Sequence, residues 1–244
     1  MRFEQMIHFV KQVPGKVGAS MFTSLQAQTN PQHNAFLKQL QKELRVEDSL
    51  TIPLKELDVV VFDLETTGFF PDKGDEILSI GAIRVKGEKI AENDTFYSLV
   101  RCETALSTEI KELTGISEDD VIGAPPLSEV LVEFFKFVQN ATLVAHHANH
   151  EKQFIRHATW KLFRSQFQHR IVDTSFLVRI AEPQTKLIRL EDCCAYTGIQ
   201  IEDRHHALGD AKMTAQLWSI YLKKIQQLGC ETLQDMYRSL AKFM

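Results

Sequence analysis

The chain has 244 residues, of which 44% are apolar and 25% are charged. That is enough material for one large globular domain, or for one domain with an appendage. The net charge of −4 excludes a globally basic nucleic-acid binder, so a nucleic-acid partner would need a local basic patch or bound metal ions. No apolar run is long enough to cross a bilayer, which predicts a soluble protein with no membrane partner.

The cysteines and the N-terminus predict a cytoplasmic location. No C-x-x-C pair occurs, and the one adjacent pair is poorly spaced for a zinc site, so we expect reduced, buried thiols. The first residues are amphipathic rather than continuously apolar, which argues against a signal peptide. The four cysteines are Cys102, Cys193, Cys194 and Cys230.

Residues 1–56 carry helical patterns and predict an N-terminal helical extension. Residues 2–12 place four apolar side chains on one helical face, and residues 14–18 break that helix. A second helix is signalled by Asn30 as its N-cap and by Pro31 at its first position. The main domain, a second copy of the chain or another protein would cover the apolar faces of these helices.

From Leu57 onward the pattern predicts an α/β domain over residues 57–228. Three strands joined by short links, at 59–64, 77–85 and 95–100, indicate an antiparallel meander. Helices then alternate with two short strands, which predicts a mixed five-stranded sheet flanked by helices. The two strands are expected at 142–145 and 171–172. The helices are expected at 107–113, 127–138, 149–163, 174–181, 189–197 and 210–228, with a C-terminal helix within 229–244.

The first of these strands ends in two carboxylates, Asp63 and Glu65, followed by Thr66, Thr67 and Gly68. Side chains alternate along a strand, so the two acids share one face a few ångströms apart. Ionised acids on a buried strand repel one another, and a divalent cation between them would relieve that repulsion. The alternative for an isolated D-x-E is a strand end with two solvated acids.

Three further clusters stand at strand ends or helix starts, the edge of an α/β sheet where sites are usually built. His146 to Glu151 follows the strand predicted at 142–145. Asp173 ends the next strand, and we expect it either to have a structural role or to support the metal ligands from behind. His205 to Asp210 leads into the long helix.

Together, these motifs resemble the three exonuclease motifs of the DEDDh 3′–5′ exonucleases, which are relatives of the proofreading epsilon subunit of bacterial DNA polymerase III and of ribonuclease T. The resemblance rests on D-L-E-T-T-G at 63–68, the segment 146–154 and H-x-A-x-x-D at 205–210, in that order. It covers about residues 57–228 and implies an RNase H-like fold. It also implies an enzyme that hydrolyses the 3′ ends of single-stranded DNA or RNA and releases nucleoside 5′-monophosphates.

The resemblance further implies a two-metal mechanism with Mg²⁺ or Mn²⁺ ions roughly 3.5–4 Å apart. Asp63 would bridge both ions, while Glu65 and Asp210 would bind the ion on the nucleophile side. Glu151 would supply the fourth acidic ligand. His205 would accept the proton of the attacking water, a role suited to an imidazole.

The second motif departs from the family pattern H-N-A-x-F-D-x-x-F. Here Glu151 replaces the aspartate, His147 the asparagine and His150 the phenylalanine. Glutamate remains a hard oxygen ligand, but its extra methylene displaces the carboxylate, and a shift of ~1 Å can cost roughly 100-fold in rate. Activity would be reduced, shifted toward Mn²⁺ or retained by a helix shift. The alternative is a decayed, non-catalytic nucleic-acid-binding module.

Substrate contacts are expected around the first two motifs, each with a structural alternative. Thr66, Thr67 and Gly68 would touch the terminal nucleotide or only shape the turn. His146 and His150 are candidate substrate contacts, although His146 also suits a structural hydrogen bond at the strand end. Phe69 and Phe70 would stack on a terminal base or be buried. A basic run would line a phosphate track, and it comprises Arg156, Lys161, Arg164, Arg170, Arg179, Lys186 and Arg189.

The sequence leaves the partners of the domain open. No residue is placed to read a 2′-hydroxyl, so the choice between DNA and RNA is undecided. The resemblance to a proofreading subunit implies attachment to a DNA polymerase through the N-terminal helices, and self-association through those helices is the alternative.

Overall fold

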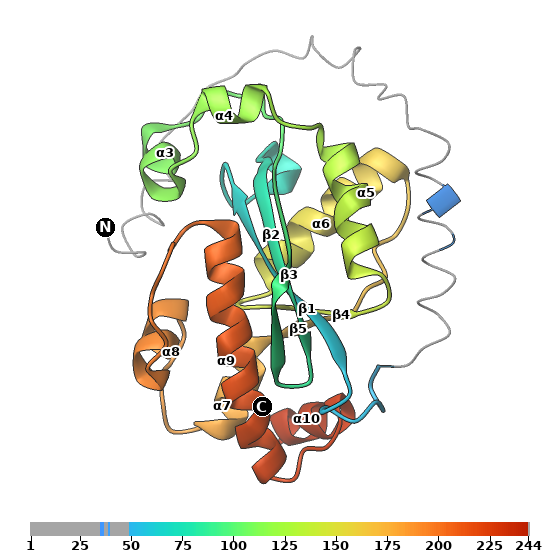
Figure 1. Ribbon diagram of the computed structural model, residues 1–244, viewed down its shortest axis with the longest axis vertical. Coiled ribbons are helices and arrows are strands. Elements are labelled where there is room, and N and C mark those ends of the chain that lie inside the picture. Colours follow the sequence, from blue (N-terminus) through green and yellow to red (C-terminus); the bar gives the residue numbers. More distant parts are fainter. Residues whose placement is uncertain (1–34, 37–38, 40–48, 244) are drawn as a thin grey trace.

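The computed structural model describes residues 35–36, 39 and 49–243. Five strands form one sheet in the order β3-β2-β1-β4-β5 (Figure 1). The predicted helix at 2–12 lies outside the described residues, as does the predicted second helix except for residues 35, 36 and 39, which are helical. The proposed helical extension therefore stays a prediction.

The predicted antiparallel meander is present as β1 (Asp58–Thr66), β2 (Ile77–Lys86) and β3 (Lys89–Leu99). The prediction for β3 was too short, because this strand begins at Lys89 directly after the turn. Lys86 pairs with Lys89, and Gly87 adopts a φ of 56° between them. The early part of β3 is polar and mostly exposed, so it lacks the apolar alternation on which the prediction depended.

Two parallel strands complete the sheet on the other side of β1. They are β4 (Thr142–Ala145), paired with β1, and β5 (Ile171–Asp173), paired with β4. The parallel strands end at the same edge of the sheet as the carboxyl end of β1. Residues 146–151 and Asp173 are thereby brought to the edge that carries Asp63 and Glu65.

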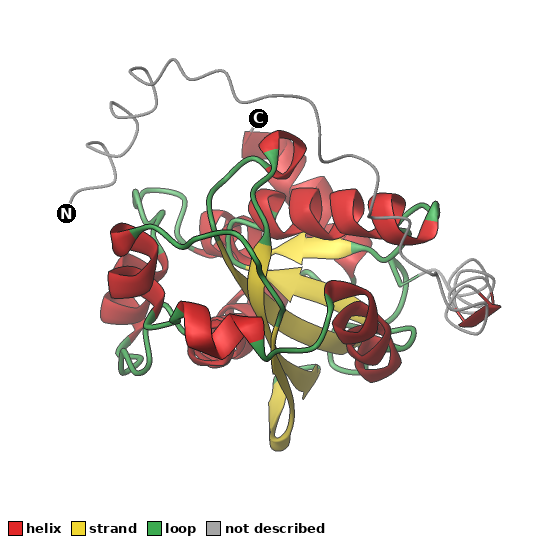
Figure 2. Ribbon diagram, turned by 90° about the horizontal axis from the view of Figure 1, so that it is seen from above, coloured by secondary structure: helices red, strands yellow, loops and turns green. Residues whose placement is uncertain are grey.

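Helices cover both faces of the sheet (Figure 2). Val60, Phe62 and Leu64 of β1 pack with the core beneath α5 (Leu127–Val138) and α6 (Asn149–Phe163). Val59 and Val61 pack on the opposite face with α7 (Thr174–Ala181) and α9 (Ala207–Gln227). Asp63 and Glu65 continue the alternation of Val59 and Val61, so they lie on the face that α9 covers.

The remaining helices are α3 (Thr108–Thr114), α4 (Glu118–Ile122), α8 (Leu190–Thr197) and α10 (Leu233–Leu240), with short 3-10 turns at Pro71–Lys73 and Ala241–Phe243. The α4 helix is not predicted from the sequence; it has five residues and is opened by a capping box between Ser117 and Asp120. The α9 helix begins at Ala207 rather than at the predicted Asp210, so Asp210 lies in its first turn.

The cysteine prediction is confirmed, since all four thiols are buried and free. Among the residues that the structure describes, no helix is long and apolar enough to span a bilayer.

Candidate metal centre

The first turn of α9 packs close to the sheet, beside the acidic end of β1, because the residue that it contacts on β2 is a glycine. Gly81 of β2 pairs opposite Asp63. A Cβ at Gly81 would lie 2.2 Å from the backbone nitrogen of Leu208, so any side chain there would push α9 away. This close approach brings the first turn of α9, and with it Asp210, over the two acids of β1.

Three of the predicted metal ligands converge. Asp63, Glu65 and Asp210 each offer a carboxylate oxygen, and these oxygens all lie within 4.8 Å of one another. Glu65 and Asp210 are 8% and 2% exposed, and Asp63 is partly exposed. Asp63 and Asp210 of this three-acid group are 147 positions apart in the chain and lie together at one edge of the sheet.

Glu151 lies next to this group but is not a member of it. It is in the first turn of α6 and is 4% exposed. Its charge is close enough to contribute to the raised pKa of Asp63. It also contributes to the raised pKa of Glu65, so the fourth predicted ligand lies close to the three-acid group.

Burial and mutual repulsion disfavour the ionised forms of the four carboxylates in this cluster. Desolvation by the surrounding protein raises the pKa of Asp63 well above its usual range, and repulsion from Glu151 and Glu65 adds to the shift. Burial likewise raises the pKa of Glu65 and of Glu151 to about 8 each, and that of Asp210 to about 6. A bound cation would favour the ionised carboxylates and reverse these shifts.

The donors present fit a divalent cation such as Mg²⁺ or Mn²⁺. In the described part of the chain, the Oδ1 atom of Asp210 and the Oε2 atom of Glu151 are buried and have no hydrogen-bond partner. Buried carboxylate oxygens without partners are costly unless something binds them. All four side chains supply hard oxygen donors, the type that these ions prefer.

His205 lies at the rim of the cluster, in the loop before α9. It has a φ of 63°, and its backbone N–H donates to Oδ2 of Asp210 at 3.3 Å. Burial, together with the positive charge of Arg204, lowers the pKa of the ring. The imidazole is therefore neutral at neutral pH, the state that a proton acceptor requires.

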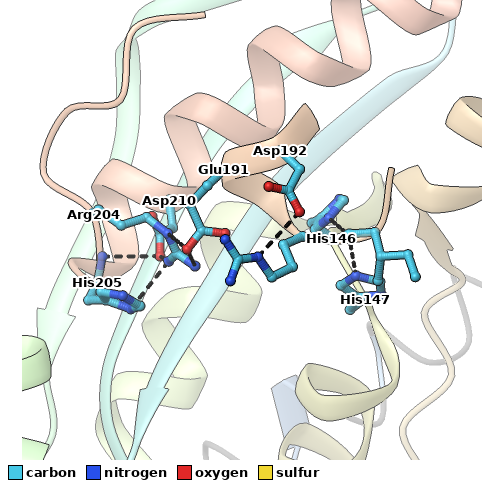
Figure 3. A network of polar contacts seen from close by, with 9 residues as sticks. His146, His147, Glu191, Asp192, Arg204, His205 and Asp210 are labelled. Atoms are coloured by element: carbon cyan, nitrogen blue, oxygen red, sulfur yellow. Dashed lines mark hydrogen bonds and ion pairs between the residues drawn. The ribbon is translucent and has the colours of Figure 1, made fainter. Parts of the chain in front are cut away.

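Arg204 belongs to this site, although it is not among the site residues predicted from the sequence. Its guanidinium forms ion pairs with Asp210 and, at 3.1 Å, with Glu191 in the first turn of α8 (Figure 3). The predicted basic run ended at Arg189, before this residue. The available signal was a cation directly preceding the histidine of the third motif.

The hydroxyls of Thr66 and Thr67 shape the turn after β1. Thr66 donates to the carbonyl of Gly68 at 2.7 Å, and Thr67 accepts from the backbone N–H of Glu76 at 2.9 Å. A Cβ on Gly68 would lie 2.4 Å from the carboxylate of Asp75. These contacts fit the structural alternative for all three residues, and their backbone contacts to a nucleotide stay a prediction.

An aromatic wall formed by Phe69 and His150 stands beside that turn. The two rings meet edge to face with centroids 5.7 Å apart, and Nε2 of His150 lies 3.3 Å from Oγ1 of Thr66. Phe69 is 46% exposed and Phe70 is 43% exposed, so the alternative of burial is wrong for both. Phe70 packs against the ammonium of Lys73.

His146 makes the structural hydrogen bonds that the sequence suggested. Its Nδ1 lies 2.7 Å from Oγ1 of Thr174, and its Nε2 lies 2.8 Å from the carbonyl oxygen of Ile188. Both ring nitrogens are thus engaged within the protein. Asp173 is also structural, because it caps α7 and accepts from the backbone N–H of Ala148 at 3.0 Å.

The predicted basic run is spread over several elements. Six of its seven members are exposed, on α6, after α6, on α7 and in the loop before α8. The exception, Arg170, is half-buried and donates to the hydroxyl of Ser49 at 3.1 Å, which suits a structural role.

The sheet order, the helices on both faces and the acidic edge define an RNase H-like nuclease fold. The nuclease domain of 3′hExo, a DEDDh family member bound to rAMP, superposes with a TM-score of 0.61 at 20% identity, covering 72% of this chain and 95% of that one. Exonuclease X in complex with 5′ overhanging duplex DNA gives a TM-score of 0.58 at 20% identity, covering 74% and 99%. The predicted fold class is confirmed.

The sequence comparisons define the family. Residues 60–218 match the family model described as Exonuclease (RNase_T). DNA polymerase III PolC-type of Caldanaerobacter subterraneus subsp. tengcongensis is 36% identical over 180 residues, which are 74% of this chain and 13% of that protein. The DNA polymerase III subunit epsilon-like protein of Rhodobacter capsulatus is 35% identical over 182 residues, which are 74% of this chain and 26% of that protein. The chain belongs to the DnaQ-like 3′–5′ exonuclease family and spans about an eighth to a quarter of the length of these relatives.

Proposed function

We propose that the protein is a divalent-metal-dependent 3′–5′ exonuclease that removes nucleoside 5′-monophosphates from single-stranded DNA or RNA. The observation that carries this proposal is the convergence of Asp63, Glu65 and Asp210 within 4.8 Å, at the edge of a nuclease fold. Solvated acids at a strand end do not explain it, because Glu65 and Asp210 are buried. A decayed site is the less favoured alternative, because all four acidic positions still carry a carboxylate and three of them converge.

Bound Mg²⁺ or Mn²⁺ would supply positive charge to the attacking and leaving oxygens of the phosphodiester. Asp63, Glu65, Asp210 and Glu151 would hold the ions, and Asp63 would be shared between two of them. His205 would accept the proton of the attacking water. Its low ring pKa keeps the imidazole ready to do so at neutral pH.

The aromatic wall of Phe69 and His150 suits the terminal base of a strand. Both rings come from segments adjoining the acids, and Phe69 presents nearly half of its surface to solvent. Base–aromatic stacking tolerates any base, so we expect little sequence preference. Exposed members of the basic run, such as Lys186 and Arg189, would contact phosphates.

Attachment to a DNA polymerase is a second, compatible proposal. It is favoured by the matched relatives, which are named as DNA polymerase III PolC-type proteins and an epsilon-like subunit. Residues 1–56 would provide the attachment, with self-association as the alternative.

Matched DNA and RNA oligonucleotides of one sequence test the proposed reaction and its substrate. Each carries a 5′ label and either a free or a phosphorylated 3′ end, and is incubated with the purified chain and Mg²⁺ or Mn²⁺. We expect a ladder that shortens from the free 3′ end, with nucleoside 5′-monophosphates as products. The absence of digestion with either metal, or products carrying 3′-phosphates, would overturn the proposal.

A further inference from the structure

Arg204 bridges the cluster of acids to α8. On one side, Nη1 of its guanidinium contacts Oδ2 of Asp210. On the other, Nε and Nη2 lie 3.2 and 3.1 Å from Oε1 of Glu191. The planar guanidinium holds its nitrogens in a fixed geometry, so one side chain fixes the relative positions of both carboxylates. Figure 3 shows Arg204 reaching from the loop before α9 to these two acids.

The two oxygens of Asp210 have different surroundings as a result. Oδ2 receives the guanidinium of Arg204 and the backbone N–H of His205. Oδ1 is buried and has no hydrogen-bond partner in the described part of the chain. The contacts to Oδ2 fix the rotation of the carboxylate about its Cβ–Cγ bond, which leaves Oδ1 free for a ligand.

We propose that Arg204 is a positioning residue for the metal centre: it holds Oδ2 of Asp210 so that Oδ1 is presented to the ion, and Glu191 holds Arg204 in turn. This inference rests on the metal site of the proposed function. Groups that hydrogen-bond to metal ligands orient them, and their loss typically costs 10- to 100-fold in metal affinity.

Simple charge repulsion makes the opposite prediction. Arg204 is a cation beside a cation site, so its removal should strengthen metal binding if its charge alone mattered. Positioning predicts weaker binding on the same substitution. The sign of the change therefore separates the two accounts.

The test is calorimetric titration of Mn²⁺ into the full chain after metal removal, without nucleic acid. We expect Arg204→Met to weaken Mn²⁺ binding by about tenfold or more. Arg204→Lys keeps the positive charge but loses the planar guanidinium, so its Mn²⁺ affinity should lie between those of Arg204→Met and wild type. Glu191→Gln should weaken binding by about threefold. Arg204→Met combined with Glu191→Gln should match Arg204→Met alone, because Glu191 acts through Arg204.

Matched controls come from two exposed ion pairs, in which Asp192 lies 3.3 Å from Arg189 and Lys223 lies 3.4 Å from Glu88. Lys223→Met and Asp192→Asn make the same charge changes at exposed positions and should leave Mn²⁺ affinity within about twofold of wild type. Circular dichroism verifies that each variant is folded. If Arg204→Met does not fold, the Mn²⁺ affinities of Arg204→Lys and Glu191→Gln, compared with those of wild type and the controls, test the positioning role instead.

Two failures are distinguishable. If the wild type binds no Mn²⁺, the metal site and this inference both fall. If the wild type binds Mn²⁺ while Arg204→Met binds it equally or more tightly, or while Glu191→Gln behaves like Asp192→Asn, the positioning role falls and the proposed function stands.

Discussion

In the metal-free protein, the free energy of unfolding should fall as the pH rises. The reason is that buried carboxylates hold protons in the folded state. Burial raises the pKa of Glu65 and of Glu151 from 4.5 to about 8. A folded pKa above the unfolded one stabilises the fold below pH 4.5, and that stabilisation is lost as the pH rises through about 8. Two buried histidines, His146 and His169, have pKa values lowered to about 4. Below pH 6.5 they make the fold less stable as the pH falls, which opposes the effect of the acids. The pH range in which these histidines do not oppose the effect of the acids is therefore 6.5 to 8.5.

The expected slope follows from proton linkage. Each extra proton bound by the folded state makes the free energy of unfolding fall by about 1.4 kcal/mol per pH unit. With roughly one such proton from the coupled acids, the melting temperature of a chain of this length should fall by roughly 3–5 °C per pH unit. Thermal denaturation in a chelator, followed by circular dichroism at pH 6.5, 7.5 and 8.5, measures this slope.

Two comparisons refine the experiment. Saturating Mn²⁺ should remove the slope, because the ion takes the place of the protons. Glu65→Gln should flatten it in the chelator, whereas Glu92→Gln, which changes an exposed acid on β3, should not. A metal-free melting temperature that rises or stays constant from pH 6.5 to 8.5 would refute the reasoning.

Three substitutions test other parts of the account. Glu151→Asp should lower kcat with Mg²⁺ by roughly 100-fold, since it withdraws the carboxylate by about one C–C bond from a site built for glutamate. Phe69→Ala should raise KM for single-stranded oligonucleotides about tenfold, because the terminal base loses a stacking partner. Gly81→Ala should cost about 2–3 kcal/mol in denaturant unfolding, because its Cβ would meet the backbone of Leu208 at 2.2 Å.

Each of these has a control and a contrary result. An unchanged or higher kcat for Glu151→Asp would show that the site is not fitted to the longer side chain of glutamate. Phe70→Ala, at a ring of similar exposure, should leave KM nearly unchanged, and equal effects of both phenylalanines would contradict the stacking role. Gly123→Ala meets open space and should be nearly neutral, and the packing argument fails if Gly81→Ala is neutral too.

Several elements could be predicted closely from sequence because their patterns are local. The strand β4 and the helices α5, α6 and α7 match the predicted bounds, each marked by apolar periodicity or by a short apolar run between turn residues. The alternation of β1 was enough to place Asp63 and Glu65 on one face. The missed parts lacked such a signal: the polar edge of β3 shows no alternation, and α4 is too short to show a period.

The candidate site was predictable only in part, for a different reason. Motif order identified Asp210 and His205, but the contact of Arg204 with Glu191 joins two segments whose approach depends on how α8 packs beside α9. The exposure of Phe69 likewise depends on the turn stabilised by Thr66 and Thr67. Such long-range contacts leave no periodic trace in the sequence.

The most direct test of the central claim compares Asp63→Asn with wild type on one 5′-labelled, single-stranded oligonucleotide in Mn²⁺. This substitution keeps the shape of a side chain common to both proposed ion sites and removes its charge. Asp58→Asn, on the exposed start of the same strand, is the matched control. The account predicts shortening from the 3′ end by wild type and Asp58→Asn, and a loss of at least about 100-fold for Asp63→Asn with its fold intact. Equal digestion by all three proteins would contradict it.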